Sequence, residues 1–417
     1  MVSFSQLRDA KPGLWQDAAD DWLAGARHSA RCADEIRARG SGPLVEHWQD
    51  KVGQLAGAML ADLATKFEVA SDVMQGAAMV LDALAESISL AQRTLRRAIE
   101  DAQEAGYLVA EDGSLRQGPV RLPGMVDYLS VRSRIDEALR EASQADQKAA
   151  AALNHIQDSV GMTDPAKAIN EVQVQASHDQ MDILRADIPV GQDSQMVKNW
   201  WASLTAQQQQ QLELAVPTVL AGLDGIPEDV KNTLRGDGSK YDRIKLVQWA
   251  LDHSNDTSID AFEKTNCANF VSTALRESGV QEKNNGWGTL SSGNWVEGMQ
   301  TGWKSLDQRD FSHSATWTRA DKLHDFLASN GGQEVALDQV RPGDVIFFEQ
   351  DSPNSEIPQG QIHHAAIVTA VTPDGDIKYT QHSDNEQNLS LSGRELHENT
   401  TEGHQNVHAV RVNPNWY

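Results

Sequence analysis

Apolar side chains in the first part of the chain recur at the spacing of helices. Between residues 12 and 36 they return every three or four positions, and Pro12 stands where helices often begin. We expect residues 40–43, Gly-Ser-Gly-Pro, to end this helix and begin another. The same alternation of steps then continues from Leu44 to Ala98. Such a sustained stripe predicts a long helix that packs along one apolar seam.

A short interruption and a further helix follow the long stripe. Residues 106–115 contain an Asp-Gly pair, which predicts a brief excursion around a turn. Helical spacing resumes near Val126 and continues to about Ile156. We therefore predict that residues 1–160 form an all-α region organised as a helical hairpin.

Residues 161–238 predict a helical connector. A helix is expected to begin near Ser203 or Thr205 and to continue through the five glutamines at 207–211. Gly-Asp-Gly-Ser at residues 236–239 then breaks the pattern. This break marks the boundary before a third region, residues 239–417, so the fold class is multidomain.

The third region changes character, because helical stretches come first and strand-like runs come afterwards. The expected helices are 241–251, 266–278 and 319–328, and the expected strands are 344–348, 364–371 and 377–382. Helices followed by consecutive strands are typical of an α+β domain with an antiparallel sheet.

Composition and charge exclude several classes of function. The formal charge of −24 disfavours nucleic acid and anionic membrane surfaces as partners. No run approaches 18 uncharged apolar residues, so we expect no membrane span. The first residues lack a basic segment followed by an apolar one, so we expect no cleaved secretory signal. Cys32 and Cys267 lack zinc-ligand spacing, and we expect neither a metal site nor a cofactor.

Cys267 and His364 form a candidate catalytic pair. Thr265 or Asn266 is suited to cap a helix, which places Cys267 in its first turn. Backbone N–H groups and the helix dipole favour a thiolate there, and a histidine is needed to take the thiol proton. The alternative is a small buried cysteine with a solvated histidine pair at His363-His364. Cys32 lies on the apolar face of the first helix, and we interpret it as a core residue.

The hairpin after His364 predicts a third polar residue. Residues 372–376, Thr-Pro-Asp-Gly-Asp, suit a three-residue loop with glycine in the left-handed conformation. That register places Asp384 opposite His364 and His382 diagonal to it, all on one face. A two-residue loop would reverse the parity and present two other residues, Gln381 and Asn385.

The motifs of the third region resemble the bacterial Putative amidase domain family. They occur in the expected order over about 170 residues, at 266–272, 343–345, 364–368 and 379–383. The family is similar to NlpC-type and CHAP-type cell-wall endopeptidases, so the resemblance implies a papain-like fold. It also implies Cys267 as nucleophile, His364 as base and His382 as the best match for the third member. The family usually has aspartate where Asn266 stands, which alters the local charge and the helix cap.

The earlier regions resemble parts of secreted bacterial proteins. Residues 10–160 are similar to the helical hairpins of WXG-type and LXG-type proteins exported by type VII secretion. Tyr107 and Glu111 match the spacing of an export tag, although the residues after Trp48 lack the expected glycine. Residues 200–227 resemble a connector of actinobacterial effectors. A generic coiled hairpin is the alternative for the first region.

These observations define two classes of function. The first is a cysteine-dependent amidase or endopeptidase that hydrolyses cell-wall peptide, as an effector or toxin exported without a signal peptide. A helical secretion partner or an immunity protein would then be expected, whereas a cytoplasmic location is the alternative. The same fold also suits protein deamidation or acyl transfer. The second class is a non-catalytic interaction protein whose helical hairpin pairs with a partner.

Overall fold

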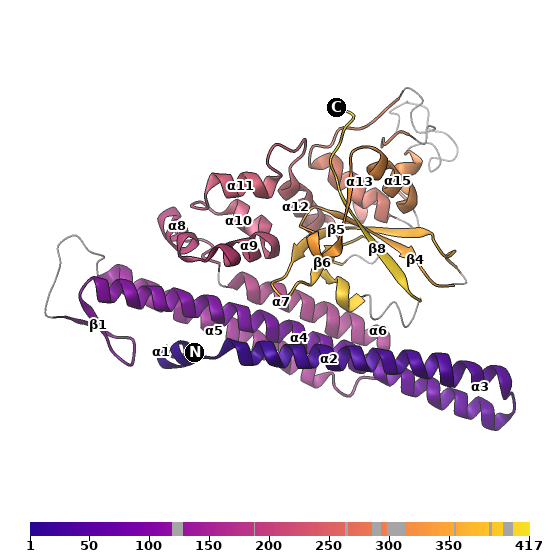
Figure 1. Ribbon diagram of the computed structural model, residues 1–417, viewed down its shortest axis with the longest axis horizontal. Coiled ribbons are helices and arrows are strands. Elements are labelled where there is room, and N and C mark those ends of the chain that lie inside the picture. The colour runs from indigo at the N-terminus through magenta and orange to yellow at the C-terminus, as the bar shows by residue number, and fades with distance from the viewer. Residues whose placement is uncertain are drawn as a thin grey trace. The chain divides into compact units, whose positions relative to one another are not determined.

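The computed structural model describes residues 1–417 except 119–127, 187, 263–265, 286–292, 298–312, 354–355, 383–385 and 395–402. Two compact units make up the chain, Met1–Gln209 and Gln210–Tyr417. The first is largely helical, and the second combines helices with an antiparallel sheet (Figure 1). The predicted multidomain layout, helical first and α+β afterwards, is confirmed. Residues 161–238 contribute helices to both units, and the division into three domains stays a prediction.

The first unit opens with two long helices that pack side by side. Its first elements are α1 (Phe4–Asp9), α2 (Pro12–Ile36), a π-helix (Arg37–Ser41), α3 (Gly42–His47) and α4 (Lys51–Glu104). Helix α2 begins at Pro12 as predicted, and α4 runs back along it (Figure 1). A new α-helix, α3, begins at Gly42 as expected, but the π-helix before it keeps the chain helical there. The break comes at residues 48–50, where the Asp50 carboxylate caps α4 by accepting from Val52 and Gly53 N–H.

Small residues, rather than large ones, form the seam between α2 and α4. The buried positions of α2 are five small residues, Ala19, Ala26, Ser29, Ala30 and Ala33. Leu14 and Trp22, which belong to the periodic apolar pattern of residues 12–36, are 63% and 45% exposed. Alanines let the two helix axes approach closely. Fewer apolar positions of α2 are therefore buried than the periodic pattern predicts. Cys32 is half-buried with its Sγ 3.7 Å from His28 Nε2, so its assignment to the core is wrong.

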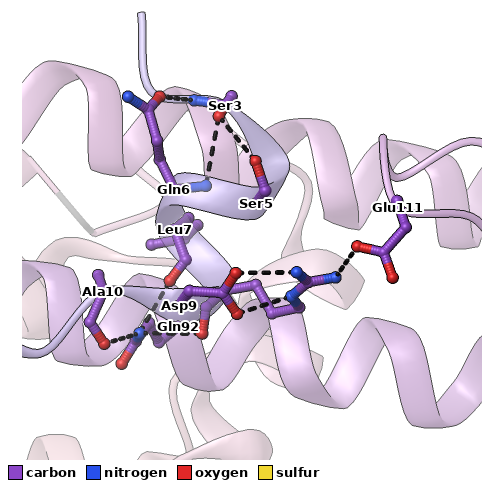
Figure 2. Close-up of polar contacts among 9 residues, drawn as sticks. Ser3, Ser5, Gln6, Leu7, Asp9, Ala10, Gln92 and Glu111 are labelled. Carbon is purple, nitrogen blue, oxygen red and sulfur yellow. Dashed lines mark hydrogen bonds and ion pairs between the residues drawn. The ribbon is translucent and has the colours of Figure 1, made fainter.

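Polar contacts fasten the N-terminal helix α1 to α4 (Figure 2). Ser3 and Gln6 form a capping box, in which each side chain accepts from the backbone N–H of the other. The Gln92 side chain of α4 donates to the carbonyls of Leu7 at 2.8 Å and Ala10 at 2.7 Å. These bonds satisfy carbonyls at the end of α1, so the helix is fixed although it is short.

The predicted turn after α4 is a small β-hairpin. Strands β1 (Tyr107–Val109) and β2 (Leu115–Gln117) pair antiparallel, and Gly113 in the turn has φ +78°. Glu111 of this turn accepts a bond of 2.9 Å from Arg8 of α1 (Figure 2). The hairpin is thereby tied to the N-terminal segment.

The remaining helices of the first unit pack around α4. They are α5 (Tyr128–Asp158), α6 (Pro165–Lys167), a second π-helix (Ala168–Gln173), α7 (Val174–Ala186) and α8 (Ser194–Ser203). Helix α9 (Ala206–Ala215) carries the glutamine run and begins after Thr205, as predicted. One 18-residue window of α4 is apolar enough to cross a membrane by length and composition. In the structure 72% of that window is buried, as in the core helix of a bundle.

The second unit places its helices before most of its strands. The helices are α10 (Pro217–Gly222), α11 (Glu228–Arg235), α12 (Arg243–His253), α13 (Cys267–Glu277), α14 (Ala315–Thr318) and α15 (Ala320–Ser329), with 3₁₀ turns at Thr257–Ile259 and Leu337–Gln339. The strands are β3 (Gln333–Val335), β4 (Val345–Gln350), β5 (Ile362–Val371), β6 (Ile377–Thr380), β7 (Leu389–Ser390) and β8 (Gln405–Arg411). All pair antiparallel in the order β3-β8-β4-β5-β6-β7. The pattern of the sequence did not predict β3, β7 or β8.

One face of this sheet carries the main core of the second unit. Val345 and Phe347 of β4 lie opposite Ile367 and Ala365 of β5, and all four side chains belong to one apolar cluster. The same cluster contains side chains of α12, α13 and α15. Because neighbouring residues of a strand point to opposite faces, residues 364 and 366 face away from this cluster.

Candidate functional site

Cys267 is the first residue of α13 and is 5% exposed. Asn266 precedes it as the N-cap residue, but its side chain makes no capping bond. Instead, Asn266 Oδ1 accepts from the N–H groups of Ala261 and Phe262 at 3.1 Å, and Nδ2 donates to Phe262 O at 2.7 Å. The expectation that Asn266 caps the helix is therefore wrong. A carboxylate cannot donate to the Phe262 carbonyl. An amide at position 266 therefore makes a bond that an aspartate would lose.

Polar bonds along α13 fix the helix that begins with Cys267. Asn269 donates to Ile259 O at 2.8 Å and accepts from Trp317 Nε1 at 2.9 Å. Ser272 accepts from Trp295 Nε1 at 3.0 Å, and both tryptophans are fully buried. These bonds come from three different segments, so the first turn of α13 has a rigid support.

His364 lies near the start of β5 and is bonded to Gln381, the residue after β6. The distance from His364 Nε2 to Gln381 Oε1 is 2.8 Å. An amide oxygen only accepts, so Nε2 carries a proton, and in the neutral imidazole Nδ1 holds the lone pair. The ring also packs against Phe348 of β4, with ring centroids 5.5 Å apart. Gln381 thus fixes both the orientation and the tautomer of His364.

The hairpin loop after β5 has the predicted geometry. Thr372 N–H bonds to Asp376 O at 2.9 Å, Gly375 has φ +88°, and Val371 pairs with Ile377. The register of the ladder beyond it nevertheless differs from the prediction. A β-bulge lies between Val368 and Ala370.

The bulge leaves Thr369 as an extra residue, because Ala370 pairs with Lys378 while Val368 pairs with Tyr379. An extra residue reverses which side chains share a face, so Gln381 joins His364 and His382 turns to the opposite face. The Thr369 hydroxyl is buried and donates to Asn388 Oδ1 at 2.8 Å. The predicted placement of His382 beside His364 is wrong for this reason, although the loop itself was predicted correctly.

His382 has partners of its own on the helix-covered face. Its Nδ1 lies 2.6 Å from Ser254 O and its Nε2 lies 2.7 Å from Asp260 Oδ1. The ring is 2% exposed and stacks on Phe270 of α13 at 5.5 Å. Each ring nitrogen therefore faces an oxygen within hydrogen-bond distance. His382 joins the end of α12, the Asp260 segment and α13. The role of Asp260 had no signal in the sequence.

Cys267 and His364 are carried by α13 and β5 of the second unit. Cys267 shares the apolar cluster with Ala365 and Ile367, whose side chains alternate with that of His364. The end of the sheet is common to both, because β5 begins there and β6 ends there. His382 and Phe270 place the first turn of α13 at the same end. The other candidates on this strand, Asp384 and Asn385, lie outside the described residues.

His313 lies beside the segment that leads into α13. Its ring packs edge-on against Phe262 at 5.2 Å and lies 6.1 Å from Trp317. Burial, aided by the positive charge of Arg276, lowers the pKa of His313 to about 4. This imidazole is therefore neutral near pH 7 and behaves as a packing group.

Comparison with known families identifies the second unit more closely. Residues 240–404 match the family described as Putative amidase domain, which supports the amidase domain predicted from the sequence. The matched segment includes Cys267, His364, Gln381 and His382. No curated protein and no solved structure matches the chain.

Proposed function

We propose that the second unit is a cysteine-dependent amide hydrolase with a papain-like arrangement, in which Cys267 is the nucleophile and His364 the base. The observation that carries this proposal is the 2.8 Å bond between His364 Nε2 and Gln381. It leaves the lone pair on Nδ1, which is the form of histidine that accepts a proton. The family match of residues 240–404 supports amide hydrolysis as the reaction class.

The reaction would proceed through a thioester. His364 Nδ1 takes the proton of the Cys267 thiol, and Sγ attacks the amide carbonyl to give a tetrahedral oxyanion. The backbone N–H of Cys267, at the start of α13, supplies one donor to that oxyanion. His364 then returns the proton to the leaving amine, and the C–N bond breaks. Water, deprotonated by the same histidine, hydrolyses the thioester to an acid and regenerates the thiol.

The proposal requires a defined geometry at one end of the second unit's sheet. Catalysis requires Cys267 Sγ and His364 Nδ1 to lie within hydrogen-bond reach at the end of the sheet where β5 begins. A covalent crosslink between the two side chains in a Cys32→Ala chain would measure this proximity.

We propose bacterial cell-wall peptide as the substrate. The experiment is digestion of purified peptidoglycan by the full chain, with identification of the new amine and carboxyl ends by mass spectrometry. The proposal expects new ends with the wild type and none with Cys267→Ala. A wild-type chain that leaves peptidoglycan intact but deamidates a glutamine substrate would move the assignment to protein deamidation, and transfer to an added amine would move it to acyl transfer.

We also propose that the first unit directs export by a type VII-like route without a signal peptide. Support comes from the long helical hairpin and from the spacing of Tyr107 and Glu111. Glu111 is paired with Arg8, which offers a matched control. Replacement of Tyr107 and Glu111 by alanine should abolish export, whereas Arg8→Ala should not. If both variants are exported like the wild type, the cytoplasmic alternative gains support.

A further inference from the structure

A second cluster of histidines lies in the second unit, on the part of the sheet formed by β3, β8 and β4. It consists of His324 from α15, Glu334 from β3 and His408 from β8, and one ligand-type atom of each lies within 4.8 Å of the others. His324 Nε2 lies 3.3 Å from Glu334 Oε1. Phe347 of β4 packs edge-on against the His324 ring at 5.1 Å. Three separate elements therefore bring nitrogen and carboxylate ligands to one point.

The imidazole of His324 is the unusual member of this cluster. Its side chain is 13% exposed, and both ring nitrogens are shielded from solvent. Among the described residues neither nitrogen has a hydrogen-bond partner, although Glu334 and Asp325 carboxylates lie at 3.3 Å and 3.5 Å. Buried polar atoms normally have hydrogen-bond partners. The ring nitrogens of His324 face two carboxylates without bonding either, so their hydrogen-bonding capacity is unused.

We propose that His324, Glu334 and His408 bind a divalent transition metal ion, with Zn²⁺ as the best fit. Two imidazole nitrogens and one carboxylate oxygen form a ligand set that zinc uses in proteins. With metal–ligand distances near 2.0 to 2.1 Å, tetrahedral ligands are spaced about 3.3 Å apart. The His324–Glu334 pair already has that spacing. All three ligand atoms lie within 4.8 Å of one another, so rotation of side chains can bring the third into the same shell.

The surroundings of His408 support a bound cation. Its Nε2 lies 3.0 Å from Glu349 Oε2 of β4. A ligating histidine usually donates its other N–H to a carboxylate, which sets the tautomer and orients the ring. Glu349 is placed for this role when Nδ1 of His408 binds the metal. Three carboxylates, from Asp325, Glu334 and Glu349, surround two imidazoles, so a divalent ion would offset concentrated negative charge.

The position of the cluster indicates a structural role. A bound ion would link α15 to β3 and β8, whereas Cys267 and His364 come from α13 and β5. The metal would therefore stabilise the second unit without entering the proposed hydrolysis. No spacing signal for this site occurs in the sequence, because its three ligands are spread over 85 positions, from 324 to 408.

The test is zinc binding by the full chain with both cysteines replaced, Cys32→Ala and Cys267→Ala, so that no thiol contributes. Calorimetric titration with Zn²⁺ should give one site per chain, and the melting temperature should rise with zinc and fall back with a chelator. His408→Ala and Glu334→Gln should each weaken binding by about tenfold or more. His404→Ala, an exposed histidine just before β8, should leave binding unchanged.

Two results would overturn the proposal. One is the absence of stoichiometric binding in a chain whose circular dichroism shows it folded. The other is binding that survives His408→Ala and Glu334→Gln together, which would place the ion elsewhere. Because the cysteines are absent from this background, neither result bears on the proposed cysteine chemistry. Cobalt(II) absorption bands that disappear in His324→Ala would confirm that this imidazole is a ligand.

Discussion

His364 and His382 lie within one hairpin, yet the structure gives them different surroundings. His364 bonds Gln381 through Nε2, and in the neutral ring Nδ1 holds the lone pair. His382 meets an acceptor at each nitrogen, Ser254 O and Asp260 Oδ1. The first arrangement suits a base that gains and loses a proton, and the second suits a fixed link between segments. The hydrogen-bond partners of a histidine, rather than the motif it belongs to, therefore determine its chemical role.

Removing the nucleophile should have the largest effect on activity. Cys267→Ala takes away the atom that forms the thioester, and we expect hydrolysis to fall by at least about 1000-fold. The thermal midpoint should change little, because alanine is close in size to cysteine. Cys32→Ala is the matched control, and its activity should stay within a few-fold of the wild type. Equal losses in both variants would contradict the assignment of Cys267.

Removing the positioning residue of His364 should have the next largest effect. We expect Gln381→Ala to lower kcat by roughly 10- to 1000-fold with a smaller change in KM, because the imidazole loses its tautomer and orientation. Gln381→Glu keeps an accepting oxygen and should recover much of the loss. Steady-state kinetics of the three chains provide the measurement. If alanine and glutamate variants behave alike, the hydrogen bond has no role in turnover.

His382→Ala should act on stability more than on chemistry. The substitution leaves Ser254 O and Asp260 without their shared partner and opens a space beside Phe270. We expect a loss of about 2 to 3 kcal/mol in the free energy of unfolding. The kcat of the folded fraction should stay within a few-fold of the wild type. A loss of kcat larger than that of Gln381→Ala, with stability unchanged, would reverse the two roles.

The smallest expected effect concerns acid and His313. Its pKa is about 4 in the folded chain and 6.5 in its ordinary state, so the unfolded chain binds the proton more readily between these values. Stability is therefore full above pH 6.5 and declines as the pH falls toward 4. His313→Gln should flatten this part of the curve of melting temperature against pH. A curve of unchanged slope would show that His313 does not titrate there.

The sequence predicted the elements of the site better than their mutual arrangement. The helix at Cys267, the strand at His364 and the loop around Gly375 all have local signals in spacing and turn residues. The bulge at Thr369 has no such signal, and the hydroxyl of this extra residue bonds Asn388, nineteen positions later. A single extra residue reverses the facing of a strand, so Gln381 rather than His382 reached His364.

The fold of the first unit shows the same distinction. The periodicity of apolar residues predicted α2 and α4, because a long helix repeats its pattern over many residues. The same periodicity did not predict which side chains form the seam. Ala26 and Ala33 of α2 are buried, whereas Leu14 and Trp22 are exposed. The cluster of His324, Glu334 and His408 could not be predicted from the sequence, because only tertiary packing brings α15, β3 and β8 together.

The most direct test of the account is the pH dependence of alkylation at Cys267. Iodoacetamide would be applied to the Cys32→Ala chain, with and without His364→Gln, and modification of Cys267 followed by mass spectrometry. The account predicts that His364 keeps labelling fast well below the ordinary thiol pKa of about 8.5, and that His364→Gln restores the simple thiol profile. Coinciding profiles in two folded chains would contradict the central claim that His364 serves Cys267 as its base.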